Sequence, residues 1–106
     1  MDAEGIAQSG NRQRAFLDLV SRERERQLRK WGISNHSLLS WFAILGEEFG
    51  EFAKEVVELS QGRTTDPRRA LVELVQTAAV ASAIYEEYFT GESEHADVTE
   101  TSRADS

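Results

Sequence analysis

The chain has 106 residues with 19 acidic and 12 basic side chains, which gives a net charge of −7, and it contains no cysteine. This length favours one domain, the lack of cysteine rules out disulfides and thiolate metal ligands, and the acidity argues against nucleic-acid binding, which needs Lys and Arg at the phosphates. The start of the chain does not read as a signal peptide and no stretch has the length of a membrane span, so we expect a soluble cytoplasmic protein that does not bind membranes.

The first predicted element is a helix over residues 11–31. Its apolar residues recur at roughly helical spacing, and its densely charged part, residues 21–30, is typical of a solvated helix face. Gly32 suits the position just after the last helical turn. Residues 1–10 are small and polar, and we expect them to form a flexible N-terminus.

A second helix is predicted over residues 38–60, with Asn35 or Ser37 as its N-cap and Gly62 as a stop signal. Its apolar residues alternate between steps of three and four, which is typical of a helix packed nearly parallel or antiparallel to a neighbour. They are Phe42, Leu45, Phe49, Phe52, Val56 and Leu59.

A third helix is predicted from Pro67 to about Phe89. Asp66 suits the N-cap, and Pro67 suits the first helical position, where its missing N–H costs nothing. One face is apolar: Leu71, Leu74, Ala78, Ala81, Tyr85 and Tyr88. Much of the remaining surface is apolar too: Val72, Val75, Ala79, Val80 and Ile84. Because three helices of one short chain cannot easily surround such a helix, we predict a homodimer or homotetramer with this helix at the subunit interface.

Residues 91–106 hold one Val and two Ala as their only apolar residues, so we expect this acidic tail to be disordered. The sequence therefore predicts an all-α fold, a bundle based on a helical hairpin and completed by oligomerisation. Its single domain is expected to span residues 11–90.

Acidic side chains follow the apolar stripe of the second predicted helix. At about 100° per residue, Glu48, Glu51 and Glu55 line one edge of the stripe, whereas Glu47 lies further out. Like charges three and four residues apart repel, and a divalent cation relieves this repulsion because it prefers carboxylate oxygens. Glu73 lies at the edge of an apolar face of the third helix, where it faces Glu48 and Glu51 if the two helices pack antiparallel.

The same residues resemble the signature of a known family. The segment Glu47-Glu48-Phe49-Gly50-Glu51, followed by Glu73-Leu74-Val75-Gln76, is similar to the E-E-x-x-E … E-x-x-D signature of the MazG-like all-α nucleoside triphosphate pyrophosphohydrolases. The resemblance covers roughly residues 20–85. It implies cleavage of a nucleoside or deoxynucleoside triphosphate between the α and β phosphates, giving the monophosphate and pyrophosphate. It also implies Mg²⁺ or Mn²⁺ as cofactor and a dimeric or tetrameric assembly.

Carried over by position, the resemblance implies that Glu48, Glu51 and Glu73 are metal ligands. It implies that Glu47 is a further ligand or the catalytic group that activates the attacking water. Gln76 stands where the family has Asp, and its carbonyl oxygen can coordinate a metal but brings no charge. Gln76 could therefore be a metal ligand, hold a metal-bound water, or mark a chain that has lost activity.

Basic and aromatic residues near these motifs are candidate substrate contacts. Lys54, and also Lys30 or Arg63, can contact phosphate oxygens, while Trp31 or Trp41 can stack on the base. Each has a structural alternative, because Lys54 can form a surface ion pair and the two tryptophans can anchor the core.

Three functions fit this sequence. The first is a metal-dependent nucleoside triphosphate pyrophosphohydrolase. The second is a catalytically weakened or inactive relative that binds a nucleotide or a protein partner, which Gln76 supports. The third is a purely structural helical oligomer whose glutamates are solvated.

Overall fold

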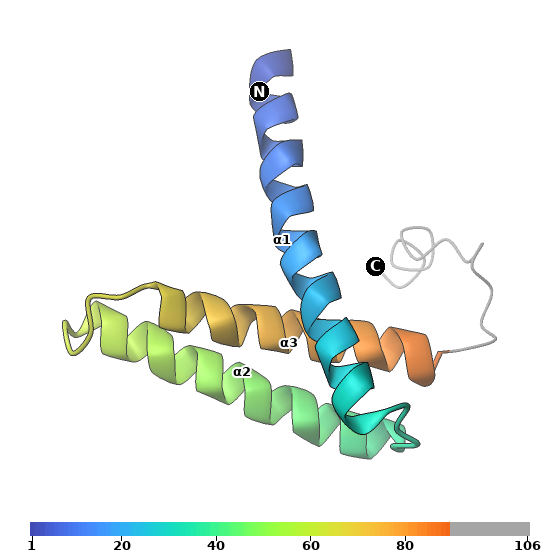
Figure 1. Ribbon diagram of the computed structural model, residues 1–106. Helices are drawn as coiled ribbons and strands as arrows, with labels where there is room; N and C mark the ends of the chain where they lie inside the picture. The colour runs from blue at the N-terminus through green and yellow to red at the C-terminus, as the bar shows by residue number, and fades with distance from the viewer. Residues whose placement is uncertain (90–106) are drawn as a thin grey trace, which may run out of the picture.

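The computed structural model describes residues 1–89 and forms three helices, with no strand in that range (Figure 1). Helix α1 spans Ala3–Trp31, α2 spans Leu38–Ser60 and α3 spans Arg68–Glu87. Helices α2 and α3 form an antiparallel hairpin, and α1 crosses α3 steeply and projects beyond it (Figure 1). The predicted all-α class is confirmed, while the predicted disordered tail lies outside the described residues.

Helix α1 begins at Ala3, well before residue 11, where the sequence predicted its start. The side chain of Asp2 caps it by accepting a hydrogen bond from the backbone N–H of Gly5 at 2.8 Å. Glu4 adds a favourable negative charge in the first turn. This capping outweighs the weak helix propensity of the small, polar residues that made the segment resemble a loop. The expected flexibility of residues 1–10 stays a prediction.

The other helix ends follow the sequence closely. Gly32 ends α1 with φ of +70°, a conformation that favours glycine. Ser37 caps α2 by accepting a hydrogen bond from the backbone N–H of Ser40 at 3.1 Å. Asp66 accepts one from the backbone N–H of Arg68 at 3.0 Å, but the N-cap residue of α3 is Pro67, so the predicted cap and helix start each lie one residue too early.

The core lies where α3 packs against both other helices. Trp41 of α2 packs with Val80 and Ala83 of α3, and Ala79 and Val20 are buried between α3 and α1. The hairpin therefore has an inner face, which we define as the side on which α1 packs, and an outer face on the opposite side. Within residues 1–89, no helix is both long and apolar enough to pass through a bilayer.

The packed stripe of α2 differs from the predicted one. Leu45, Phe52 and Leu59 are partly buried, but Phe42 and Phe49 are 72% and 60% exposed. The contact with α3 is rotated away from these phenylalanines and toward Trp41, which is buried. A helix that is apolar over half its circumference offers two possible seams, and spacing alone does not select between them.

The apolar face of α3 that contains Leu74, Tyr85 and Tyr88 does not pack within the single chain, and the predicted subunit interface stays a prediction. Leu74, Tyr85 and Tyr88 are exposed, whereas Ala79, Val80 and Ala83 on the opposite side are buried. Small side chains at these positions let two helices approach α3 closely. The residues of the predicted face lie on the outer face instead.

Arg24 joins α1 to the end of α3. The residue is 8% exposed; its Nε donates to Glu86 at 3.0 Å and its Nη2 to Glu87 at 3.3 Å. Nη1 donates to the side-chain oxygen of Gln27 at 3.0 Å. Glu87 also accepts a hydrogen bond from the backbone N–H of Ser34, which ties the α1–α2 loop to the same point.

Candidate functional site

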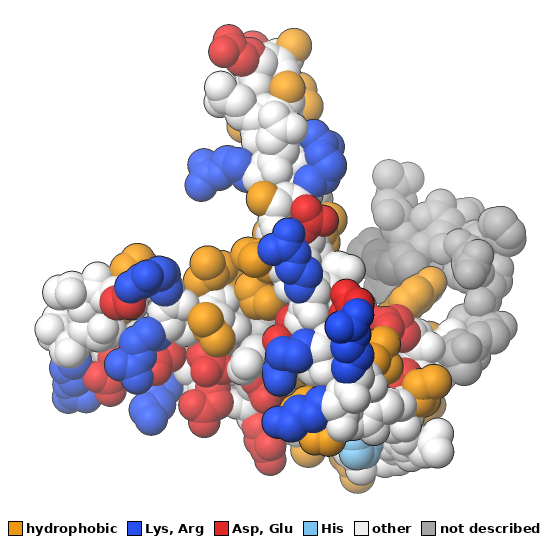
Figure 2. Space-filling view, viewed as in Figure 1, with side chains coloured by type: hydrophobic (Ala, Val, Ile, Leu, Met, Phe, Trp, Pro, Cys, Tyr) orange, Lys and Arg blue, Asp and Glu red, His pale blue; other side chains and the backbone are white. Residues whose placement is uncertain are grey.

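The glutamates of the two acidic motifs lie along the inner face, on neighbouring helices. Glu48 and Glu51 project from α2, and Glu73 projects from the neighbouring α3. Glu48 and Glu73 are partly buried, while Glu47 and Glu51 are exposed. Figure 2 shows acidic side chains gathered along the hairpin beside the lower half of α1. The antiparallel hairpin therefore brings together the two motifs, as expected from the sequence.

The carboxylates of this cluster disfavour one another's ionised forms. Burial raises the pKa of Glu48 above its usual value, and the negative charges of Glu73, Glu51, Glu47 and Glu23 raise it further. The ionised form of Glu48 is thus disfavoured by both effects. A bound cation would remove this penalty.

Glu73 has the same character on the facing helix. Burial raises the pKa of Glu73, followed by the charges of Glu51 and Glu55. Of these, Glu55 has a counter-charge, because Arg69 Nε lies 3.4 Å from its Oε2. This is a long ion pair rather than a hydrogen bond, since Oε2 is buried without a hydrogen-bond donor in the described chain.

The other carboxylates of the cluster are not paired with a basic side chain in the described chain. Within residues 1–89, Glu47, Glu48, Glu51 and Glu73 make no salt bridge. The cluster therefore holds negative charge that the chain itself does not neutralise. Hard oxygen ligands with excess negative charge are the chemistry that suits Mg²⁺ or Mn²⁺.

The side-chain rotamers do not complete a metal site by themselves. In the part of the chain that the structure describes, no three acidic or His side chains lie close enough together to hold one ion. The donor set fits a divalent cation by chemistry, and glutamate side chains have three rotatable bonds through which their carboxylates can converge.

A pocket of about 540 Å³ opens beside the carboxylates on the inner face. All three helices and the α1–α2 loop line it; the lining includes Glu23, Trp31, His36, Trp41, Glu48 and Gln76. Gln76 therefore lies at the pocket together with Glu48, although the family motif has an acid at its position. Glu48 is the link between the carboxylate cluster and the pocket.

The two tryptophans have different roles in this pocket. Trp41 is 5% exposed and belongs to the core, and the His36 ring packs edge-on against it with centroids 4.8 Å apart. Trp31 is 62% exposed, so its interpretation as a core anchor is wrong. The Nζ atom of Lys30 lies 4.7 Å from the centroid of a Trp31 ring, a cation–π contact that holds the indole at the pocket edge.

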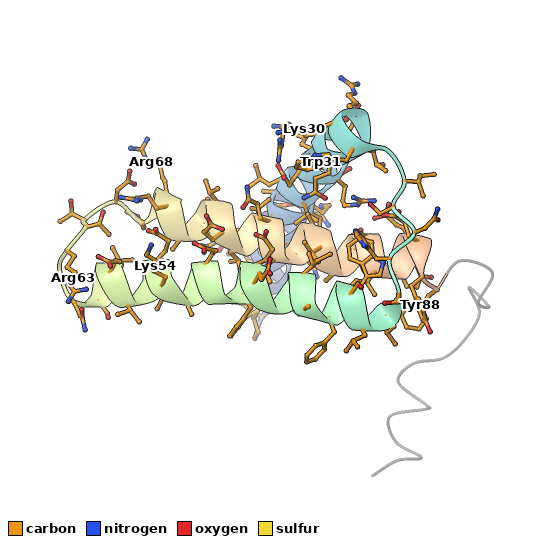
Figure 3. The ribbon with its side chains drawn as sticks, turned by 90° about the horizontal axis from the view of Figure 1, so that it is seen from below. Lys30, Trp31, Lys54, Arg63, Arg68 and Tyr88 are labelled. Atoms are coloured by element: carbon orange, nitrogen blue, oxygen red, sulfur yellow. The ribbon has the colours of Figure 1, made fainter. Side chains whose placement is uncertain are left out.

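The structure does not bring every candidate residue to the pocket. Lys54 and Arg63 lie toward the α2–α3 turn, away from Trp31 (Figure 3), and neither lines the pocket. Arg63 instead lies 3.6 Å from Glu58. The prediction that Lys54 contacts substrate is therefore not supported by its position, because its place on α2 directs it away from α3.

On α1 the sequence pointed to Trp31, which lines the pocket, but gave no sign of Glu23 and Arg26. Glu23 lines the pocket; Arg26 donates to both of its oxygens, at 2.9 and 2.8 Å. Hydrogen bonds from Arg26 lower the pKa of Glu23, outweighing the opposing effect of burial. Gln27 then links Glu23 to the buried Arg24. The alternating Arg and Glu side chains of residues 21–30 are typical of a solvated helix face. Their spacing does not indicate that α3 packs against one side of this segment.

Comparison with known proteins adds no relative. No family model matches the chain, no curated protein matches it, and no solved structure matches it. The functional argument therefore rests on the residues and geometry described above.

Proposed function

We propose that this chain is a divalent-metal-dependent nucleoside triphosphate pyrophosphohydrolase. The observation that carries the proposal is the uncompensated carboxylate cluster of Glu48, Glu51 and Glu73, which adjoins a pocket with an exposed indole. The cluster suits a cation, and the pocket has room for a nucleotide-sized ligand. The resemblance of the two acidic motifs supplies the class of reaction.

In this proposal each residue has a separate task. Glu48, Glu51 and Glu73 would hold the metal, and the Gln76 carbonyl oxygen would be a further, neutral ligand or would hold a water. A bound Mg²⁺ or Mn²⁺ would neutralise phosphate charge and lower the pKa of a coordinated water. Glu47 accepts the proton of the attacking water.

The reaction adds water to the α-phosphorus and breaks its bond to the oxygen that bridges to the β-phosphorus. The nucleoside monophosphate and pyrophosphate leave as products. Trp31 stacks on the base, since its ring is exposed at the pocket edge. Lys30, which contacts that ring but does not itself line the pocket, is the proposed phosphate contact on α1.

The test is a screen of pyrophosphate release from ribo- and deoxynucleoside triphosphates, with Mg²⁺ or Mn²⁺ and with a chelator. We expect metal-dependent release by the wild type. Glu48→Gln and Glu51→Gln should each lower it by about 100-fold or more, because each removes an anionic ligand. The matched control is Glu58→Gln on the same helix, whose carboxylate pairs with Arg63 outside the pocket and whose loss should leave turnover unchanged. Full turnover in Glu48→Gln would remove the mechanism.

Gln76 favours a second candidate function, nucleotide binding without turnover. With one fewer charge than an aspartate, the site neutralises less of the metal and phosphate charge during the reaction. The variant Gln76→Asp separates the two functions. If the wild type binds a metal–nucleotide complex by calorimetry but only Gln76→Asp releases pyrophosphate, the chain is a binding module.

A further inference from the structure

Two glutamates end α3, at a place where negative charge does not favour the helix itself. Glu86 and Glu87 are its last residues, and the C-terminal end of a helix carries the negative end of its dipole. Both carboxylates are instead stabilised by Arg24 of α1. Its Nε and Nη2 donate to Glu86 at 3.0 and 3.2 Å, and Nη2 also donates to Glu87 at 3.3 Å. The position of these two residues therefore points to a task outside α3.

The two glutamates differ in burial and in what they contact. The side chain of Glu87 is 8% exposed and lines the pocket of the inner face. It also accepts the hydrogen bond from the backbone N–H of Ser34. The side chain of Glu86 is 39% exposed, does not line the pocket, and accepts a further hydrogen bond from Ser82 on its own helix. Of the two, it is Glu87 that connects Arg24 with the α1–α2 loop.

The α1–α2 loop has few other supports. Residues 33–36 lie outside both helices, and the bond from Ser34 to Glu87 is the one hydrogen bond that they make within residues 1–89. Three of these four residues are exposed. The ring of His36 packs edge-on against Trp41. Apart from its ends, the loop is therefore held by one charge-assisted hydrogen bond and one ring contact.

The same loop forms one wall of the pocket. Gly32, Ser34 and His36 line the pocket beside Trp31, whose exposed indole lies at its edge. A shift of the loop would change the width of the pocket at this indole. A loop that is ordered before a ligand arrives adds affinity, because binding then costs less conformational entropy.

We propose that Glu87 is a positioning residue of the pocket. Oriented by the buried Arg24, its carboxylate fixes the α1–α2 loop through the N–H of Ser34 and so sets the affinity of the pocket for its ligand. That ligand is taken to be a nucleotide, so the inference rests on the proposed function. Glu87 is not among the charges that act on Glu48 or Glu73, so its loss should change binding rather than the chemical step.

The first test measures the kinetics of pyrophosphate release with the nucleoside triphosphate that the wild type turns over fastest. Glu87→Ala should raise KM by about 10-fold, roughly the worth of one charge-assisted hydrogen bond, and leave kcat within about twofold. Glu87→Gln should recover most of this loss, because its amide oxygen can still accept the bond from Ser34. An unchanged KM in Glu87→Ala overturns the proposal.

The matched control is Glu86→Ala, which removes a partner of the same Arg24 but no contact with the loop. It should keep the KM of the wild type, and an equal rise in KM would show that only the ion pair matters. Circular dichroism confirms that each variant is folded. If Glu87→Ala does not fold, Ser34→Pro removes the same hydrogen bond from the loop side, leaves the ion pair intact, and should raise KM equally.

The second test needs neither turnover nor ligand. Amide exchange measured by NMR should be at least about 10-fold slower at Ser34 than at Asn35, whose N–H has no partner within residues 1–89. Glu87→Ala should abolish this protection, and Glu86→Ala should keep it. Equally fast exchange of Ser34 in the wild type and in Glu87→Ala contradicts the proposal. If the wild type releases no pyrophosphate, the proposed function fails, and this exchange pattern still decides whether Glu87 holds the loop.

Discussion

The two faces of the α2/α3 hairpin are made of the same two helices but have opposite chemistry. The inner face holds α1, the glutamate cluster and a pocket, and its polar groups are coupled to one another. The outer face holds aromatic and aliphatic side chains without any charge. The difference shows that the position of charge around each helix separates the two faces better than the spacing of apolar residues, which is similar on both.

The two faces should also respond to different changes. Polar and charge-removing substitutions should affect stability and metal dependence on the inner face. Changes of apolar surface or of side-chain size should affect association on the outer face. The following predictions test this separation.

The largest effect is expected at the buried ion pair of the inner face. Replacing Arg24 with Ala leaves the buried Glu87 without its guanidinium partner, and loss of one member of a buried pair costs about 3–5 kcal/mol. The control Arg29→Ala removes an exposed pair with Glu25, which is worth only about 0.5 kcal/mol. Urea unfolding at one protein concentration measures both. Equal losses of stability would show that α1 is not held by its buried arginine.

The second prediction concerns pH and metal. The pKa of Glu48 and that of Glu73 are raised in the folded chain. At a pH just above the usual pKa of glutamate, the folded state therefore binds more protons than the unfolded state. Stability of the metal-free protein should therefore fall as the pH rises above about 4.5 through the raised pKa values. Glu23 affects stability in the opposite direction. Because its pKa is lowered in the folded chain, it stabilises the fold above the usual glutamate pKa, and this contribution is lost as the pH falls below about 4.5 through the lowered pKa.

Thermal melts between pH 5 and 8, with a chelator and with Mg²⁺, measure this effect. Added Mg²⁺ should restore the stability lost at high pH. Glu48→Gln without metal should melt a few degrees above the wild type, roughly the effect of less than 1 kcal/mol in a domain of this size, and should lose its response to Mg²⁺. If the melting temperature of the wild type in chelator rises steadily from pH 5 to 8, the proposed destabilisation by burial and mutual repulsion of the glutamates is contradicted.

The smallest effect is expected at Gly46, on the uncharged half of α2. An added methyl group meets nothing within 4 Å in the single chain, so alanine should stabilise the helix by about 0.5–1 kcal/mol. We expect this gain at low protein concentration, where the predicted oligomer is dissociated, measured by urea unfolding. No gain under these conditions would mean that the surroundings of Gly46 are not open in the single chain.

Much of the fold was predictable from local signals. Gly32 and Ser37 marked two of the helix ends because their caps depend on neighbouring backbone groups alone, whereas Asp66 lies one residue before the N-cap of α3. The start of α1 was not predicted, since Asp2 caps a run of small polar residues that lacks an apolar stripe. The seam was also not predictable, because Phe42 and Trp41 are adjacent in sequence and only the path of α3 decides which of them is buried.

The candidate site was predictable where it depends on one hairpin, but on α1 only Trp31 at the helix end was anticipated. Glu48, Glu51 and Glu73 meet because α2 and α3 are antiparallel neighbours, which their short connection enforces. Glu23 and Arg24 enter the site through a crossing of two helices distant in sequence, and no spacing rule specifies such a crossing. Lys54 lies on the charged half of α2 but near the α2–α3 turn and outside the pocket, a position that its closeness in sequence to the glutamates does not reveal.

The N-terminal part of helix α1 projects away from the other two helices (Figure 1). Counted from the N-terminus, the first buried side chain of α1 is Val20. A lone helical stretch of such length is marginal in water, so the backbone amides before this point should exchange with deuterium far faster than those of the second half. The gradient along one continuous helix would report, amide by amide, where tertiary support begins. If a ligand or a protein partner slows amide exchange sharply in the first turns of α1 when it is added, that partner binds to the projecting end of the helix.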